Sequence, residues 1–279
     1  LERRTRIRSH QLVSFRGIFD PMEPIVQQLN DSPVNCFSLH TRCFFPAAAG
    51  VMTLAFQGFP EGVVTLKQQL EFQNPHLSPE GMGSKWPKVT FAAVRDEVAP
   101  LSLQQLQQLR TLCVEYANRS EGPNATSGAC PHFHTLSVVE FQNRALSEVL
   151  QRWDCRCTTP CAEAERGVAV EPANAESVEY TDGVVGQLLA SAADVADYHA
   201  RFVKELAPGN NTSSHYLVTC PPQGTLVAFL RDNDAEDTVR YIEDFLAFWE
   251  ESHPELFSLY QVFPQDCWHV TLRGLALSS

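Results

Sequence analysis

Trp268-His269-Val270-Thr271-Leu272 is the stretch of sequence that decides the fold. Apolar and polar residues alternate along it, and this pattern is typical of a half-buried strand. Successive side chains of a strand point to opposite faces of a sheet, so His269 and Thr271 share one face. Val270 and Leu272 then enter the core. An imidazole and a hydroxyl are therefore expected side by side on one surface, although a lone histidine on a strand is more often a structural residue.

A second segment has the same format, Trp86-Pro87-Lys88-Val89-Thr90-Phe91. The alternation places Lys88 and Thr90 on one face of a strand and Val89 in the core. The two segments together offer a cation, an imidazole and two hydroxyls from two strands.

Working outward from these segments, hydrophobic periodicity and turn residues predict an alternation of helices and strands. Helices are expected at 21–30, 62–73, 102–117, between 141 and 150, and at 235–252. Strands are expected at 35–45, 51–59, 88–94, 134–141, 215–220, 225–231, 258–263 and 268–275. The order β-helix-β-helix-β occurs twice, which favours an α+β fold with helices packed on sheets.

The predicted domain organisation is simple. Residues 1–32 form a basic arm and a short helix, and residues 33–277 form a single domain. Residues 152–214 are interpreted as an irregular insertion, because 155–176 show no apolar periodicity.

The two segments and the elements around them resemble the duplicated halves of the 2H phosphoesterase superfamily, the RNA-ligase-like cyclic phosphodiesterases. The signature of that family is a pair of His-x-Thr/Ser motifs on central strands. Residues 51–70, which read VMTLAFQGFPEGVVTLKQQL, resemble its first strand, proline and helix. The resemblance covers residues 51–277 and implies duplicated β-α-β halves, two central antiparallel sheets that form a cleft, and helices outside.

The resemblance also implies the chemistry. One imidazole removes a proton from the attacking water or hydroxyl, the other protonates the departing oxygen, and two hydroxyls hold phosphate oxygens. His269 and Thr271 would be catalytic, and Thr90 would bind the substrate. Lys88 stands where the family has its first histidine. With an ordinary pKa of about 10.4, a lysine is a phosphate ligand or a proton donor rather than a base.

Two functions therefore remain open. The first is a phosphodiesterase that acts on a cyclic or 2′-linked phosphoester of a nucleotide or an RNA end. The second is a catalytically impaired module that binds a phosphorylated ligand or a protein. Neither requires a cofactor or a metal, and no phosphate-binding glycine loop of the GxxxxGK[ST] or GxGxxG type occurs.

Charge limits the partners. The chain has 279 residues and a net charge of −12, and its first sixteen residues hold five arginines against one glutamate. The remainder carries 16 basic and 32 acidic residues. This excess of negative charge repels extended duplex DNA or RNA. It still permits the binding of a small phosphorylated ligand or a nucleic-acid end. A monomer is expected, with the arm as the one part that could recruit a polyanion.

Membrane insertion is not expected. The apolar, uncharged stretch 43–57 is broken by Pro46 and Gly50 and is shorter than the roughly 20 residues that a spanning helix needs. A cytoplasmic location is predicted. Nine cysteines and glycosylation-type triplets at Asn118, Asn124, Asn210 and Asn211 leave a secreted glycoprotein with a structural or interaction role as an alternative.

The sequence also contains two weaker candidates for a metal site. His132 and His134 would share a face of a strand, and Cys155, Cys157 and Cys161 could bind zinc or pair as a disulfide. Strand-edge histidines exposed to solvent and cysteines without a metal are the preferred interpretations, because neither set has a third or fourth ligand at a suitable spacing.

Overall fold

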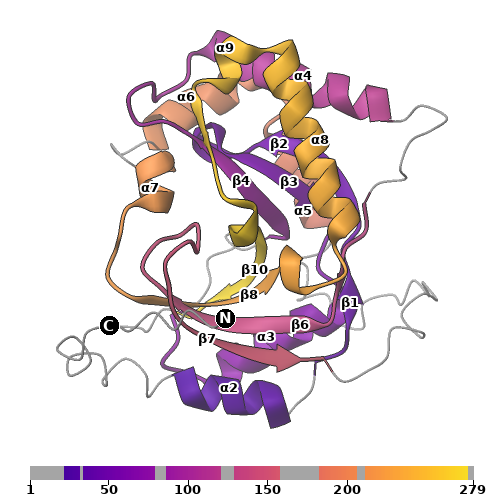
Figure 1. Ribbon diagram of the computed structural model, residues 1–279, viewed down its shortest axis with the longest axis vertical. Coiled ribbons are helices and arrows are strands. Elements are labelled where there is room, and N and C mark those ends of the chain that lie inside the picture. Colours follow the sequence, from indigo (N-terminus) through magenta and orange to yellow (C-terminus); the bar gives the residue numbers. More distant parts are fainter. Residues whose placement is uncertain are drawn as a thin grey trace, which may run out of the picture.

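The computed structural model describes residues 22–31, 34–78, 86–120, 129–157, 182–205 and 211–275. The basic arm over residues 1–16, most of the segment 155–176, Cys161 and the triplets at Asn124 and Asn210 lie outside the described residues. The described residues form an α+β fold (Figure 1). None of the described helices combines the length and the apolar character needed to cross a bilayer.

An antiparallel sheet of eight strands organises the fold. Its order is β2-β3-β4-β10-β8-β6-β7, and β9 pairs with β4 off this path. The strands are β2 (Thr41–Pro46), β3 (Met52–Phe56), β4 (Lys88–Val94), β6 (Thr135–Phe141), β7 (Val149–Arg156), β8 (Gln223–Phe229), β9 (Tyr260–Val262) and β10 (His269–Gly274). A separate pair joins β1 (Phe37–Ser38) to β5 (His132–Phe133).

The expectation of two central sheets is wrong for the described residues. The strands that carry Lys88 and His269 are neighbours in one continuous sheet, because β4 hydrogen-bonds directly to β10. This pairing joins what the resemblance implied would be two separate sheets.

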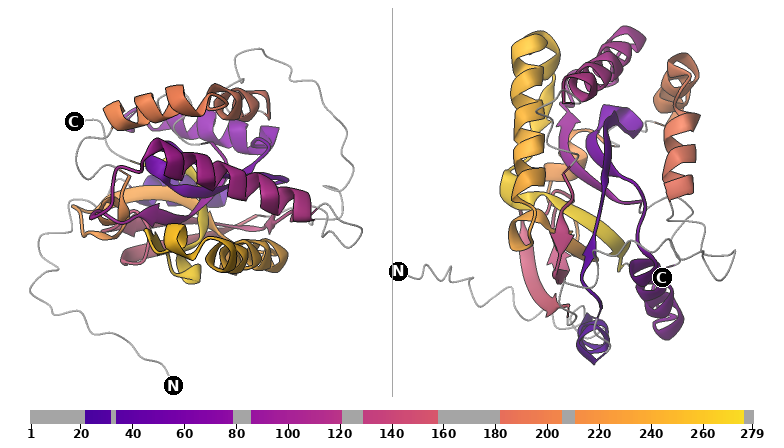
Figure 2. Two further views of the ribbon diagram at one scale, coloured as in Figure 1. Left: turned by 90° about the horizontal axis from the view of Figure 1, so that it is seen from above. Right: turned by 90° about the vertical axis from the view of Figure 1, so that its right-hand side faces the viewer.

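Helices cover both faces of the sheet. The helices are α2 (Met22–Asp31), α3 (Glu61–Gln73), α4 (Leu103–Ser120), α5 (Asp182–Ser191), α6 (Val195–Glu205), α7 (Ser213–Leu217), α8 (Glu236–Ser252) and α9 (Pro254–Phe257). Figure 2 (right) shows α8 on one side of the strands and α5 and α6 on the other. The main core contains apolar residues of α2, α3, α4 and α8, whereas α5 packs on the opposite face.

Aromatic rings fill the main core between β2, β4, α4 and α8. The ring of Phe44 stacks on Phe245 with centroids 3.9 Å apart, and it meets Phe91 edge to face at 5.8 Å. Trp249 is fully buried in the same layer. Each such ring buries a large apolar area, so this layer fixes the helices to the sheet.

Two predicted elements are wrong. The segment before Leu150 is a turn that leads into β7, not a helix, because the side chain of Asn143 hydrogen-bonds the backbone N–H and the hydroxyl of Ser147. Such side-chain bonds compete with helix formation. The predicted strand at 215–220 begins instead as the helix α7.

The interpretation of 152–214 as irregular is also wrong for its described parts. β7 continues to Arg156, and residues 182–205 form α5 and α6. The alternation of β7 is weak because most of its side chains are only half-buried at the sheet edge.

Candidate functional site

The register between β4 and β10 places the four predicted site residues together. Val270 lies opposite Val89, and both are fully buried in the core. In an antiparallel pair, this register puts His269 beside Thr90 and Thr271 beside Lys88 on the other face. The four side chains are half-buried there and line one pocket of about 540 Å³.

The imidazole of His269 is held in one orientation. Its Nδ1 lies 2.6 Å from the carbonyl oxygen of Cys267, which only accepts hydrogen bonds, so Nδ1 carries the proton. The ring also meets Phe229 edge to face at 5.7 Å. In the neutral ring, Nε2 is then the basic nitrogen, as a general base requires.

Lys88 supplies a positive charge from the neighbouring strand. Its Nζ lies 4.4 Å from the centroid of the Trp86 ring, which is a cation–π contact. The buried Trp86 ring also lines the pocket and restricts the lysine side chain. A positioned ammonium can neutralise a phosphate oxygen or donate a proton.

The described residues that line this pocket include basic side chains but no acidic ones. The lining contains Lys88, His269 and Arg144, and no Asp or Glu is among the described residues that line the pocket. Because acidic residues outnumber basic ones in the chain by 33 to 21, this absence sets the pocket apart from the rest of the protein. The pocket therefore offers an electrostatically favourable place for an anion.

Aromatic side chains form much of the remaining wall. They come from segments far apart in the sequence: Phe45, Trp86, Phe141, Tyr198, Tyr216 and Phe263. Flat π-faces near cations suit an aromatic base attached to a phosphate. The volume lies in the range of small-molecule sites.

Strained backbone is concentrated around the pocket. In the described part of the chain, three residues other than glycine have positive φ: Ala49 at 63°, Leu146 at 60° and Asn211 at 59°. Leu146 and Asn211 line the pocket, and Ala49 follows the lining residue Ala48. Left-handed backbone costs about 1–2 kcal/mol for most residues, and such strain is commonly found at functional sites.

Asp96 holds one wall of the pocket from outside. Its carboxylate accepts hydrogen bonds from the hydroxyls of Thr212, Ser213 and Ser214 at 2.6–2.8 Å, and from the Ser214 backbone N–H at 2.9 Å. Burial raises the pKa of Asp96, but these hydrogen bonds outweigh it and hold the pKa well below its ordinary value. They anchor the start of α7, which carries the lining residue Tyr216.

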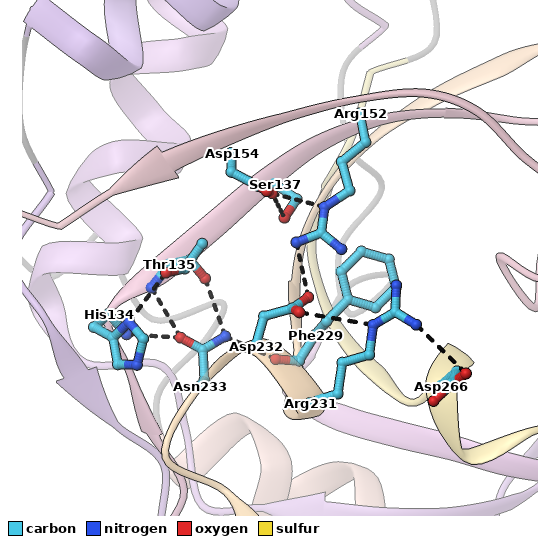
Figure 3. A network of polar contacts seen from close by, with 10 residues as sticks. All are labelled: His134, Thr135, Ser137, Arg152, Asp154, Phe229, Arg231, Asp232, Asn233 and Asp266. Carbon is cyan, nitrogen blue, oxygen red and sulfur yellow. Dashed lines mark hydrogen bonds and ion pairs between the residues drawn. The ribbon is translucent and has the colours of Figure 1, made fainter. Parts of the chain in front are cut away.

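The ring of Phe229 packs against a network of polar side chains (Figure 3). The guanidinium carbons of Arg152 and Arg231 lie 4.7 Å and 5.5 Å from the Phe229 ring centroid. Arg152 is also paired with Asp154 at 2.6 Å and with Asp232 at 2.7 Å. Since the same phenyl ring contacts His269, this network supports the imidazole from the side away from β4.

The structure does not gather the weaker candidates into a metal site. His132 hydrogen-bonds to Ser38 at 2.8 Å, and His134 to the hydroxyl of Thr135 at 3.0 Å. Cys155 is buried in the main core, and the half-buried Cys157 packs against this core. No group of three or more His, Cys, Asp or Glu within the described ranges could hold a metal ion.

Arg144 is the pocket residue that the sequence did not reveal. It lies in the turn between β6 and β7, within a segment for which a helix was predicted. The signal that could have found it is the turn chemistry of Asn143 and Ser147, which indicates a hairpin rather than a helix.

Comparisons with protein families, curated proteins and solved structures find no match for this chain.

Proposed function

We propose that the pocket binds a cyclic or 2′-linked phosphoester of a nucleotide or an RNA end and hydrolyses it, as a phosphodiesterase related to the 2H phosphoesterases. The observation that carries the proposal is the β4–β10 register, which aligns Lys88, Thr90, His269 and Thr271 on one face. The substrate is a small phosphorylated molecule or a strand end, and the protein acts as a monomer.

The fold supports the proposal through the position of these strands. β4 and β10 lie side by side within the sheet, with β3 and β2 beyond one of them and β8, β6 and β7 beyond the other. Two halves that meet along β4 and β10 are what the expected duplication would produce, with one motif from each half.

The proposed step is a hydrolysis. His269 Nε2 takes a proton from water as the water oxygen bonds to phosphorus. The phosphorus–oxygen ester bond breaks, and the ammonium of Lys88 gives a proton to the departing oxygen. Thr90 and Thr271 donate hydrogen bonds to the non-bridging oxygens as charge develops on them. Exchange with solvent returns both side chains to their starting states.

A second function is favoured by one specific observation, the lysine at position 88. A site with one imidazole and one ammonium could retain a phosphorylated ligand without turnover. The protein would then be a binding module that holds the ligand in this pocket and does not hydrolyse it.

Hydrolysis assays separate these functions. We expect turnover of one or more members of a panel of nucleoside 2′,3′-cyclic phosphates and 2′-5′-linked oligonucleotides. His269→Ala should lower kcat by about 10²–10⁴-fold, the usual contribution of general acid–base catalysis. His253→Ala is the matched control, since His253 lies between α8 and α9 and is not among the residues lining the pocket.

Three outcomes have distinct meanings. Turnover that is unchanged in His269→Ala refutes the proposed chemistry. Thermal stabilisation by cyclic nucleotides without turnover supports the binding module, and gain of turnover in Lys88→His would then show that the rest of the site is intact. Absence of both binding and turnover refutes both functions.

A further inference from the structure

Among the described residues that line the pocket, Arg144 is the arginine. Five arginines form ion pairs with Asp or Glu: Arg152, Arg201, Arg231, Arg240 and Arg273. No acid in the described ranges forms an ion pair with Arg144, which lines the pocket instead. An arginine without an acidic partner, in a pocket whose described lining lacks carboxylates, is suited to hold an anionic group of a ligand.

The turn that carries Arg144 is fixed at several points. The Leu146 N–H donates to the Asn143 carbonyl at 3.0 Å, and Asn143 also bonds Ser147 through its side chain. The Ala145 N–H donates to the Tyr216 carbonyl at 3.0 Å, which ties the turn to α7. A rigid turn presents its arginine with little loss of conformational entropy when a ligand binds.

Arg144 lies on a different wall of the pocket from Lys88. Lys88 begins β4, whereas Arg144 follows β6, and two further strands separate β4 from β6 in the sheet. The charge of Arg144 acts on the residues of α7. Burial and, after it, the nearby Arg144 lower the pKa of His215. The turn that carries Arg144 lies against α7, where the Ala145 N–H donates to the Tyr216 carbonyl.

We propose that Arg144 forms a second anion subsite, which takes a phosphate group of the ligand other than the one held above β4 and β10. This inference rests on the proposed function and narrows its substrate class to nucleotides that carry at least two phosphates. A 5′-phosphate on a nucleoside 2′,3′-cyclic phosphate is the simplest such group. The aromatic side chains that line the pocket are where the nucleoside lies.

A matched pair of ligands tests the subsite. Binding of adenosine 2′,3′-cyclic phosphate and of the same compound with an added 5′-phosphate is measured by calorimetry at one fixed salt concentration. For the unmodified protein, the 5′-phosphate should tighten binding by about tenfold or more, as one charge-assisted hydrogen-bonding group does. In Arg144→Gln this advantage should vanish, while the affinity for the compound without the 5′-phosphate changes by less than about twofold.

Two further variants serve as controls. Arg144→Lys keeps the charge without the planar fork and should retain part of the advantage. Arg240→Gln removes an exposed arginine outside the pocket and should retain all of it. Arg144 is exposed, so its variants should melt at the temperature of the unmodified protein.

The results distinguish the inference from the proposed function. If both ligands bind equally well, or if the advantage persists in Arg144→Gln, the second subsite is refuted and the phosphoester site stands. If the unmodified protein binds neither ligand, the second subsite is refuted, and the panel of hydrolysis assays decides the proposed function.

Discussion

Glu140 offers a quantitative test of the fold, because its carboxylate is buried and makes no hydrogen bond to any described residue. The residue is 2% exposed, and neither carboxylate oxygen has a hydrogen-bond partner in the part of the chain that the structure describes. It lies opposite Gly224 on β8, on the face covered by Met22 of α2. A buried polar group of this kind is costly, so Glu140→Leu should stabilise the protein.

The size of the effect comes from two contributions. A buried polar group that lacks a hydrogen bond costs about 1–3 kcal/mol in proteins. Leucine has a similar volume and adds apolar contact with the side chains of the main core. We therefore expect Glu140→Leu to raise the free energy of unfolding by about 1–3 kcal/mol near neutral pH.

The same burial predicts a pH dependence. Burial raises the pKa of Glu140 above its ordinary value of 4.5, so the folded state holds its proton to higher pH than the unfolded state does. Between those two pKa values the stability of the unmodified protein falls as pH rises. The advantage of Glu140→Leu should therefore be smallest below pH 4.5 and grow as pH rises through the raised pKa.

Urea unfolding, followed by circular dichroism at several pH values between about 4 and 8, measures this advantage. Glu140→Gln is the control that removes the charge but keeps an unsatisfied polar group, and it should recover only part of the gain. A destabilised Glu140→Leu protein, or an advantage that does not change with pH, would refute the reasoning.

Three further predictions concern Asp96, Arg273 and Phe229. Asp96→Asn should speed amide hydrogen exchange in α7. In the unmodified protein, the contribution of Asp96 to stability should persist down to about pH 4 and be lost as pH falls through its lowered pKa, which exchange measured against pH would reveal. Arg273→Ala should lower the free energy of unfolding by about 2–4 kcal/mol, because the side chain is 1% exposed, whereas Arg273→Met should cost under about 1.5 kcal/mol. If both substitutions lowered the free energy of unfolding equally, a packing role of the Arg273 side chain would be contradicted. Phe229→Leu should lower kcat with little change in KM and shift the pH profile, because it removes the ring that orients His269; an unchanged profile would show that the ring does not act through the imidazole.

The sequence by itself determined the local features of this protein. The period-two alternation placed Lys88 with Thr90, and His269 with Thr271, on common faces, and the periodicity of 235–252 predicted the helix α8. These features depend on neighbouring residues, which is why pattern and propensity are sufficient for them.

Only the tertiary structure decided how these pieces form a site. The pairing of β4 with β10 joins residues that lie far apart in the sequence, and no local pattern specifies such a partner or its register. The helical form of α7 depends on the carboxylate of Asp96, which lies far away in the sequence. Arg144 enters the pocket because a side-chain hydrogen-bonded turn replaces the predicted helix. The sequence failed at α7 because long-range hydrogen bonds to Asp96 hold that helix, and it failed at Arg144 because the local side-chain bonds of Asn143 favour a turn over a helix.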